Sequence, residues 1–272
     1  MKKVYAVYFS GTGTTKRTVN FIANNLAERF CLPKEEFNFT FPKIREEIKE
    51  FEKDDLVIFG VPVIAGRVPN VLLKYFEKLK GNGAIVVPIV LFGNRDFNDS
   101  LLELSDLLIN SNFKPIAGGA FVGEHSFSKV LAKGRPDEKD FSIMKEFSEK
   151  IYEKISREDF DSNKFVEITH GERPFKYYKP KDAEGNHIDI RKVIPKTITN
   201  LCDDCKVCAI VCPMGSIDYN NTEKITGICI KCCACIKKCH TSAKYFDDEG
   251  YLYHKKDLEE KYKRRAEPEL FY

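Results

Sequence analysis

Nine of the ten cysteines in this 272-residue chain lie in two short runs near its C-terminus, and eight of them share one repeated spacing. One run spans residues 202–212 and the other 229–239, and both have the spacing C-x2-C-x2-C-x3-C. Three thiolates at this spacing can converge on one cubic iron–sulfur cluster, while the fourth thiolate of each run reaches the other cluster. The spacing therefore predicts two [4Fe-4S] clusters.

The two runs resemble those of the bacterial two-cluster ferredoxins, and Pro213 follows the first run as in that family. Two departures stand out. His240 occupies the place where a proline often follows the second run, and Cys233 is an additional thiol that we interpret as free and packed. The resemblance implies one cluster on Cys202, Cys205, Cys208 and Cys239, and a second on Cys229, Cys232, Cys235 and Cys212.

Two structural zinc sites are the main alternative, because pairs of cysteines separated by two residues also suit zinc. Four cysteines within eleven residues, occurring twice, favour clusters over zinc. Disulfides are less favoured because nothing indicates secretion. The apolar run 4–9 is too short for a signal peptide, and no run approaches the roughly 18 residues of a membrane span. We expect a cytoplasmic protein with no membrane partner, in a compartment that keeps thiols reduced.

Length and composition predict two domains, since about 150 residues per domain is usual and 43% of residues are hydrophobic. The formal net charge is +3. Two oxidised clusters and a nucleotide phosphate would bring it to about −3, since bound groups must be counted. Bulk charge therefore gives no indication of a nucleic-acid partner.

A second chemical motif lies near the N-terminus. The apolar run 4–9 predicts a strand buried on both faces, and the stripe Val19, Ile22, Leu26 and Phe30 predicts a helix. Backbone amides at a helix N-terminus favour an anion, and glycines let it come close. The residues between strand and helix, here named the glycine-threonine loop, are Ser10, Gly11, Thr12, Gly13, Thr14 and Thr15.

This loop resembles the flavodoxin fingerprint [S/T]-x-T-G-x-T, which in that family binds the phosphate of FMN. An ordinary strand–helix turn capped by hydroxyl groups is the alternative. The chain contains neither the nucleotide-triphosphatase motif G-x-x-x-x-G-K-[ST] nor a G-x-G-x-x-G motif with its acidic partner. We therefore expect FMN and no NAD site.

Further apolar runs alternate with helical patterns, as in a doubly wound parallel sheet. Pro88 is expected to cause a local irregularity because it cannot donate a ladder hydrogen bond. The pattern predicts an α/β fold with a flavodoxin-like five-stranded parallel sheet, followed by a small α+β ferredoxin domain. Expected strands are 4–9, 37–40, 56–61, 84–91 and 115–121, and expected helices include 44–50, 72–79, 101–108 and 136–156.

Loops that follow parallel strands meet at one edge of the sheet, where ligands bind. We expect Phe97 to stack on the flavin ring, or else to pack on the following helix. Arg67 would stabilise a reduced anionic flavin, or else be a solvated surface charge. Glu124 and His125 are weaker candidates for proton transfer. The expected ring contacts are Pro62, Ala65, Gly66 and Arg67 in one loop, and Phe92, Gly93, Asn94 and Phe97 in the next.

The remaining segments carry no motif. We interpret residues 1–156 as the FMN-binding domain, 157–195 as a linker packed on both domains and 196–246 as the ferredoxin domain. Residues 247–272 form a tail whose charged stretch 255–265 predicts an exposed helix.

The order of the domains resembles the flavodoxin–ferredoxin fusion proteins of anaerobic bacteria and archaea. That resemblance implies FMN, two [4Fe-4S] clusters and electron transfer with a redox protein partner, such as a ferredoxin-type donor or an oxidoreductase. One alternative is a flavin-dependent reductase that the clusters supply with electrons and that acts on a small-molecule acceptor. Another is a non-redox binding module that contains zinc.

Overall fold

A parallel sheet forms the centre of the first part of the chain. The computed structural model describes residues 1–272. Its parallel strands follow the order β2-β1-β3-β4-β6, which is the doubly wound flavodoxin-like order 2-1-3-4-5. The predicted α/β fold class is confirmed. The strands are β1 Lys3–Tyr8, β2 Lys34–Asn38, β3 Asp55–Pro62, β4 Ile85–Phe92, the short β5 Lys114–Pro115 and β6 Gly118–Val122.

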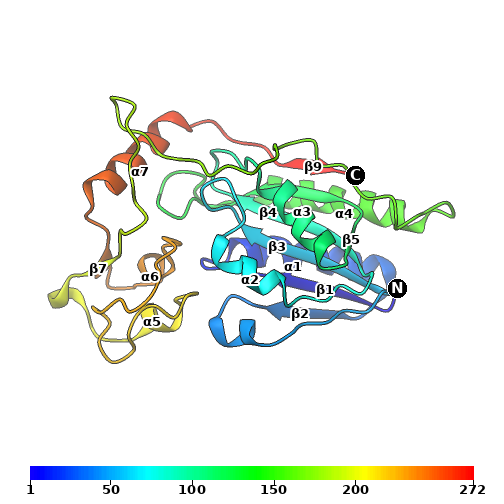
Figure 1. Cartoon of the computed structure of the whole chain (residues 1–272), viewed down its shortest axis with the longest axis horizontal. Coiled ribbons are helices and arrows are strands. Elements are labelled where there is room, and N and C mark those ends of the chain that lie inside the picture. The colour runs from blue at the N-terminus through cyan, green and yellow to red at the C-terminus, as the bar shows by residue number, and fades with distance from the viewer.

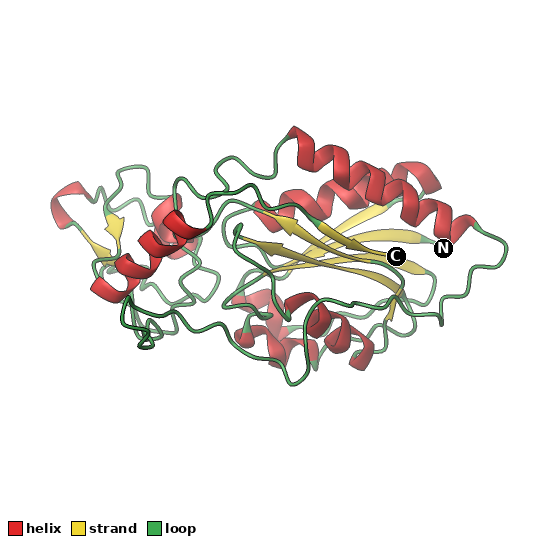
Figure 2. Ribbon diagram, turned by 90° about the horizontal axis from the view of Figure 1, so that it is seen from above, coloured by secondary structure: helices red, strands yellow, loops and turns green.

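Helices cover both faces of this sheet (Figures 1 and 2). On one face, α1 Thr14–Phe30 and α4 Glu138–Ser156 pack over Val4, Ala6 and Tyr8 of β1. The other face carries the short 3-10 helix η2 Asn70–Leu72, α2 Leu73–Phe76 and α3 Ser100–Asn110.

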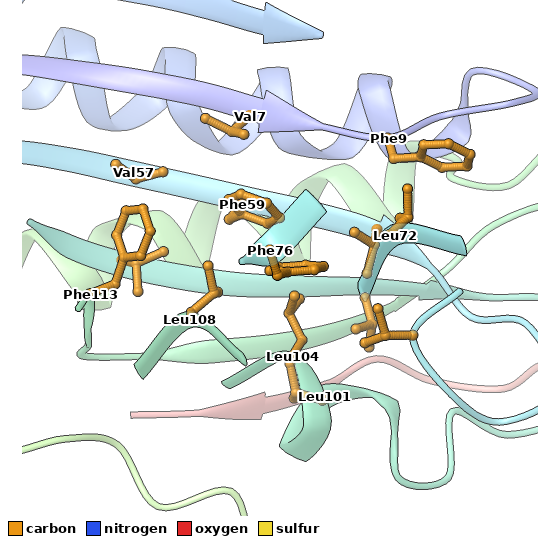
Figure 3. Packing of buried hydrophobic residues seen from close by; sticks show 14 of the residues in the cluster. Val7, Phe9, Val57, Phe59, Leu72, Phe76, Leu101, Leu104, Leu108 and Phe113 are labelled. Atoms are coloured by element: carbon orange, nitrogen blue, oxygen red, sulfur yellow. The ribbon is translucent and has the colours of Figure 1, made fainter. Parts of the chain in front are cut away.

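Figure 3 shows Val7, Phe9 and Phe59 facing Leu72 and Phe76 on this second side. Alternate residues of β1 therefore enter two separate cores, which explains why the whole strand is apolar.

Three local expectations compare with the structure as follows. The irregularity at Pro88 is confirmed. Lys114 and Ile116 donate backbone hydrogen bonds to Ala84, just before β4, and to Val86 within it. The backbone of Pro88 faces the same side, and there the neighbouring strand is interrupted between β5 and β6. Strand β2 begins three residues earlier than expected. The expected helix 44–50 is instead the 3-10 helix η1 Pro42–Glu46.

The cysteine-rich segment 196–246, named the cysteine unit, is a small α+β structure. Strands β7 Lys196–Thr197 and β8 Lys244–Tyr245 pair antiparallel and close its ends. Between them lie the 3-10 helix η3 Thr199–Leu201 and two single-turn helices, α5 Val207–Ile210 and α6 Ala234–Lys237. The unit lies beyond the carboxyl ends of the parallel strands (Figure 1).

The tail does more than extend into solvent. Helix α7 Glu249–Lys261 occupies the position expected for a charged helix, but it buries Tyr251, His254 and Leu258. Strand β9 Glu269–Phe271 then pairs antiparallel with β6 and adds an edge to the parallel sheet. The sheet therefore has one strand position more than the five expected, because residues from the far end of the sequence return to it.

The segment 157–195 contacts both parts of the protein. Val166 donates a backbone hydrogen bond to Pro115 of the sheet, and Tyr178 donates one to Ala65. At its other end, Arg191 accepts a hydrogen bond from Lys231 of the cysteine unit at 2.6 Å. No helix in the structure combines the length and the apolar composition needed to cross a membrane.

Candidate cofactor sites

The backbone conformation repeats between the two cysteine runs. Asp204 and Lys206 have φ of 59° and 63°, and Lys231 and Cys233, at the same positions of the second run, have φ of 54° and 57°. Left-handed residues reverse the chain direction between successive cysteines. The repeat therefore turns the thiols of each run inward by the same local geometry.

Five cysteines line one apolar pocket, together with residues such as Pro213 and Ile217. Four of them, Cys212, Cys229, Cys232 and Cys235, are named the second cysteine set, and the fifth is Cys233. Burial raises the pKa of the Cys232 thiol to about 12, and the thiols of Cys212 and Cys229 add to this. Thiolates at such a site need the positive charge of a bound metal. These four residues are the ligand set that the sequence implied.

The other four cysteines are named the first cysteine set: Cys202, Cys205, Cys208 and Cys239. Cys208 is buried, and burial raises its thiol pKa, with Cys202 contributing in the same direction. At Cys239 burial acts to raise the thiol pKa, but hydrogen bonds from Thr241 and nearby backbone amides outweigh it, so the pKa is lowered. Cys205 is exposed. This end of the cysteine unit therefore faces solvent, whereas the second cysteine set is enclosed.

The distances between the thiols distinguish a site for a cluster from a site for a single zinc ion. Tetrahedral zinc binds sulfur at about 2.3 Å, which brings the sulfurs within about 4 Å of one another. The one group of three ligand-type side chains within 4.8 Å is Asp203, Cys205 and His240. No three cysteine sulfurs approach that closely. The cysteines are therefore not arranged around a single tetrahedral zinc ion, and the cysteine-rich segment is compatible with clusters.

Cys233 and His240 are the two residues that depart from the ferredoxin pattern, and the structure shows the surroundings of both. Cys233 is 3% exposed, and its thiol lies 3.5 Å from the Tyr251 hydroxyl. Burial raises the pKa of this thiol to about 11. His240 is exposed and lies 2.8 Å from a carboxylate oxygen of Asp203. Neither side chain takes the place of a cysteine in the two sets.

The glycine-threonine loop presents free backbone donors. No protein acceptor is bonded to the N–H groups of residues 11–15, and the N-terminus of α1 has no side-chain cap at Gly13. The Ser10 hydroxyl accepts a hydrogen bond from Lys16, and Gly13 has a φ of 101°, which favours glycine. Unpaired amides at a helix start fit the phosphate of FMN. Binding of the FMN phosphate by these residues stays a prediction.

A polar cavity of about 360 Å³ borders this loop. Its lining contains no hydrophobic side chain and combines residues of the sheet with residues of the cysteine unit: Thr12, Thr14, Arg17 and Glu124 from the first, and Lys237 and Lys238 from the second. Sequence reasoning did not identify the two lysines, because only the tertiary structure brings α6 to the loop.

The loop after β3 contains Pro62, Ala65, Gly66 and Arg67. Ala65 and Gly66 have φ of 50° and 78°. The Arg67 guanidinium is paired with Glu103 and lies over the rings of Phe175 and Tyr177. Its charge is therefore neutralised by Glu103 and covered by residues 175–177, so neither a free charge at the flavin nor a solvated arginine describes it.

The loop after β4 contains Phe92, Gly93, Asn94 and Phe97. The side chain of Asn94 is 3% exposed and bonds to the backbone of Tyr262, Arg264 and Ala266 in the tail. Phe97 is equally buried, and its ring centroid lies 3.9 Å from that of His170. Phe97 therefore packs within the protein against the segment 157–195, whereas the alternative interpretation placed it on the following helix. Gly93 lies against the ring of His125.

Glu124 and His125 belong to the contact between the two units. Lys237 donates hydrogen bonds to Glu124 at 2.5 Å and to the His125 carbonyl at 2.8 Å. Burial, followed by the charge of Lys237, lowers the pKa of His125 to about 3. The His125 ring is therefore neutral near pH 7.

The two candidate sites touch one another. A Cβ placed on Gly11 would lie 3.3 Å from Cβ and 3.4 Å from Sγ of Cys232. Beside this contact, Arg45 donates a hydrogen bond to the Pro213 carbonyl at 2.8 Å. The loop suited to a nucleotide phosphate and a ligand of the second cysteine set are thus direct neighbours.

No protein-family model matches the sequence, and no curated protein matches it. A solved flavodoxin from the domain Archaea is 15% identical, with a TM-score of 0.39, over 58% of this chain and 100% of that chain. A variant flavodoxin of Fusobacterium nucleatum bound to flavin mononucleotide is 18% identical, with a TM-score of 0.38, over 57% and 96%.

An NADH:FMN oxidoreductase in its apo form is 14% identical, with a TM-score of 0.44, over 58% of this chain and 92% of that chain. These similarities are distant. We therefore base the fold class on the strand order of the sheet.

Proposed function

We propose that this protein is an electron-transfer protein that carries one FMN and two [4Fe-4S] clusters. One observation supports the proposal most directly: Gly11 in the loop suited to the FMN phosphate lies against Cys232. When bound, the clusters exchange single electrons and the flavin exchanges one or two. The protein would therefore connect one-electron and two-electron redox partners.

The chain's own residues have distinct tasks in this function. The first cysteine set would hold the cluster nearest solvent, since Cys205 is exposed there. The second cysteine set would hold the cluster beside the flavin, because its cavity is enclosed and Cys232 contacts Gly11. The free amides of residues 11–15 would bind the phosphate. A redox protein partner would then approach at the exposed end of the cysteine unit.

The alternative is a flavin-dependent reductase of a small molecule, as one distant structural neighbour is an NADH:FMN oxidoreductase. The packing around the strand-end loops favours electron transfer instead. Tyr178 is bonded to Ala65, and Asn94 holds the tail segment 262–266. Both segments lie over the loops that an external substrate would have to reach.

The test is cofactor analysis of protein purified without oxygen. We expect about eight irons and one FMN per chain, from the cofactors proposed, together with cluster signals in the electron paramagnetic resonance spectrum after reduction. Stepwise titration with a one-electron donor should then reduce clusters and flavin in the same molecule. A colourless protein that contains zinc would overturn the proposal.

A further inference from the structure

Helix α6 joins the two candidate sites. It begins two residues after Cys232, contains Cys235 and ends at Lys237. It is a single turn of four residues, too short to be stable in isolation. Its conformation therefore depends on what its cysteines bind and on what its lysine contacts.

Lys237 is the main contact from this helix to the sheet. Its side chain is 17% exposed, and the ammonium group donates hydrogen bonds to Glu124 and to the carbonyl of His125, in the loop that follows β6. Burial acts to raise the pKa of Glu124, but the hydrogen bonds from Lys237 and from the Gly134 amide lower it overall. This carboxylate is therefore charged. The ion pair fixes α6 against one wall of the polar cavity beside the glycine-threonine loop.

The same helix also completes that cavity. Lys237 and Lys238 line it together with Thr12, Gly13 and Thr14. The side chain of Lys238 is exposed, and only the backbone N–H of this residue donates a hydrogen bond. With Arg17, which lines the same cavity, Lys238 places positive charge near the unpaired amides of residues 11–15, where a dianionic phosphate gains most from it.

We propose that the cluster on the second cysteine set and FMN bind cooperatively, because α6 carries a cluster ligand at one end and completes the nucleotide site at the other. Cluster binding orders α6, which presents Lys237 and Lys238 to the loop, while the Gly11–Cys232 contact joins the two sites directly. This inference rests on the proposed function. Binding coupling is reciprocal, so FMN must stabilise the same cluster to the same extent.

The experiment measures FMN affinity by the quenching of flavin fluorescence, with full-length protein freed of flavin under anaerobic conditions. Lys237→Met keeps the alkyl chain and removes the ammonium group, and Cys235→Ala removes the cluster of the second set. We expect each to weaken FMN binding by roughly tenfold, within the usual range of coupling between sites. Lys224→Met, an exposed lysine elsewhere in the cysteine unit, is the matched control and should bind FMN like the parent protein.

The reciprocal arm uses Cys205→Ala, which should retain only the cluster of the second set. At equilibrium with a competing chelator, FMN should raise the fraction of this variant that retains its iron, by the same factor as the cluster tightens FMN binding. Adding Lys237→Met should remove that protection.

The outcomes separate the inference from the function on which it rests. Parental FMN affinity in Lys237→Met with both clusters present, or equilibrium iron retention that does not depend on FMN, would overturn the coupling and leave the electron-transfer proposal intact. Absence of flavin or iron from the parent protein would overturn the proposed function itself. Should Cys235→Ala fail to fold, the Lys237→Met measurements decide the question alone.

Discussion

At the scale of single residues, charge and burial decide which side chains are free for chemistry. Arg67 and Glu103 illustrate this. Glu103 is 3% exposed, accepts two bonds from Arg67 and also accepts one from the Val68 amide. A carboxylate held in this way orders the loop after β3 and the start of α3 together. Its role is structural even though it lies beside a candidate cofactor site.

Arg67→Met should destabilise the protein by about 3–5 kcal/mol, because it leaves a buried carboxylate without its partner. Denaturant unfolding followed by circular dichroism measures this. The matched control is Arg191→Met, whose ion pair with Asp189 is exposed and should contribute no more than about 1 kcal/mol. Equal losses in the two variants would contradict the structural role of the Arg67–Glu103 pair.

Cys205→Ala should remove the cluster of the first cysteine set and reduce the iron content by about half, since each cluster holds four irons. FMN should remain, because Cys205 lies at the end of the cysteine unit that is exposed to solvent. Iron and flavin assays on the same sample measure both. Full iron content in this variant would show that the ligand assignment is wrong.

Stability should fall when the pH is lowered from 7.5 to 5.5. Burial lowers the pKa of His125 to about 3 and that of His254 to about 4, whereas an unfolded histidine has a pKa of about 6.5. Between these values the unfolded chain binds more protons than the folded chain, so stability decreases with decreasing pH. The change should be smaller in His125→Asn, and an unchanged denaturant midpoint in the parent protein would contradict the neutral buried rings.

At the scale of elements, the sequence predicts those motifs whose geometry is set by a few neighbouring residues. The two cysteine runs and the loop between β1 and α1 could be recognised because three or four residues set their local geometry. Phe97, Asn94 and Arg67 could not be assigned, because their partners His170, Ala266 and Glu103 come from distant segments. No local pattern distinguishes a side chain that faces a ligand from one that faces another part of the chain.

The loop itself gives a prediction at this scale. Thr12→Ala combined with Thr15→Ala should weaken FMN binding, because both hydroxyl groups lie in the loop whose amides are free. Flavin fluorescence titration measures the affinity. The conservative pair Thr12→Ser and Thr15→Ser keeps both hydroxyls and should restore most of the binding. Unchanged affinity in the alanine variant would count against a phosphate-binding role for these side chains.

At the scale of the whole molecule, the tail fastens the cysteine unit to the sheet. The Asn94 side chain bonds to three backbone groups between Tyr262 and Ala266, and the Ala266 carbonyl accepts a bond from buried Arg135. Strand β9 then pairs with β6. The two units are therefore joined twice, by the segment 157–195 and again by the tail (Figure 2).

Asn94→Ala should loosen this second connection, because it leaves several buried backbone groups without partners, at a cost of about 1–3 kcal/mol each. Trypsin should then cleave faster within the basic stretch 263–265. Asn186→Ala is the control, since its side chain bonds only within an exposed turn. Equal cleavage rates in the two variants would contradict the fastening role of Asn94.

The position of β9 also affects how the protein is made. As the ribosome releases the chain, β6 appears about 150 residues before its neighbour β9, and both cysteine runs emerge in between. Until β9 has emerged, the outer side of β6 is an unpaired edge that can associate with other nascent chains. Completion of the N-terminal sheet therefore has to wait for β9, which follows both cysteine runs in the sequence.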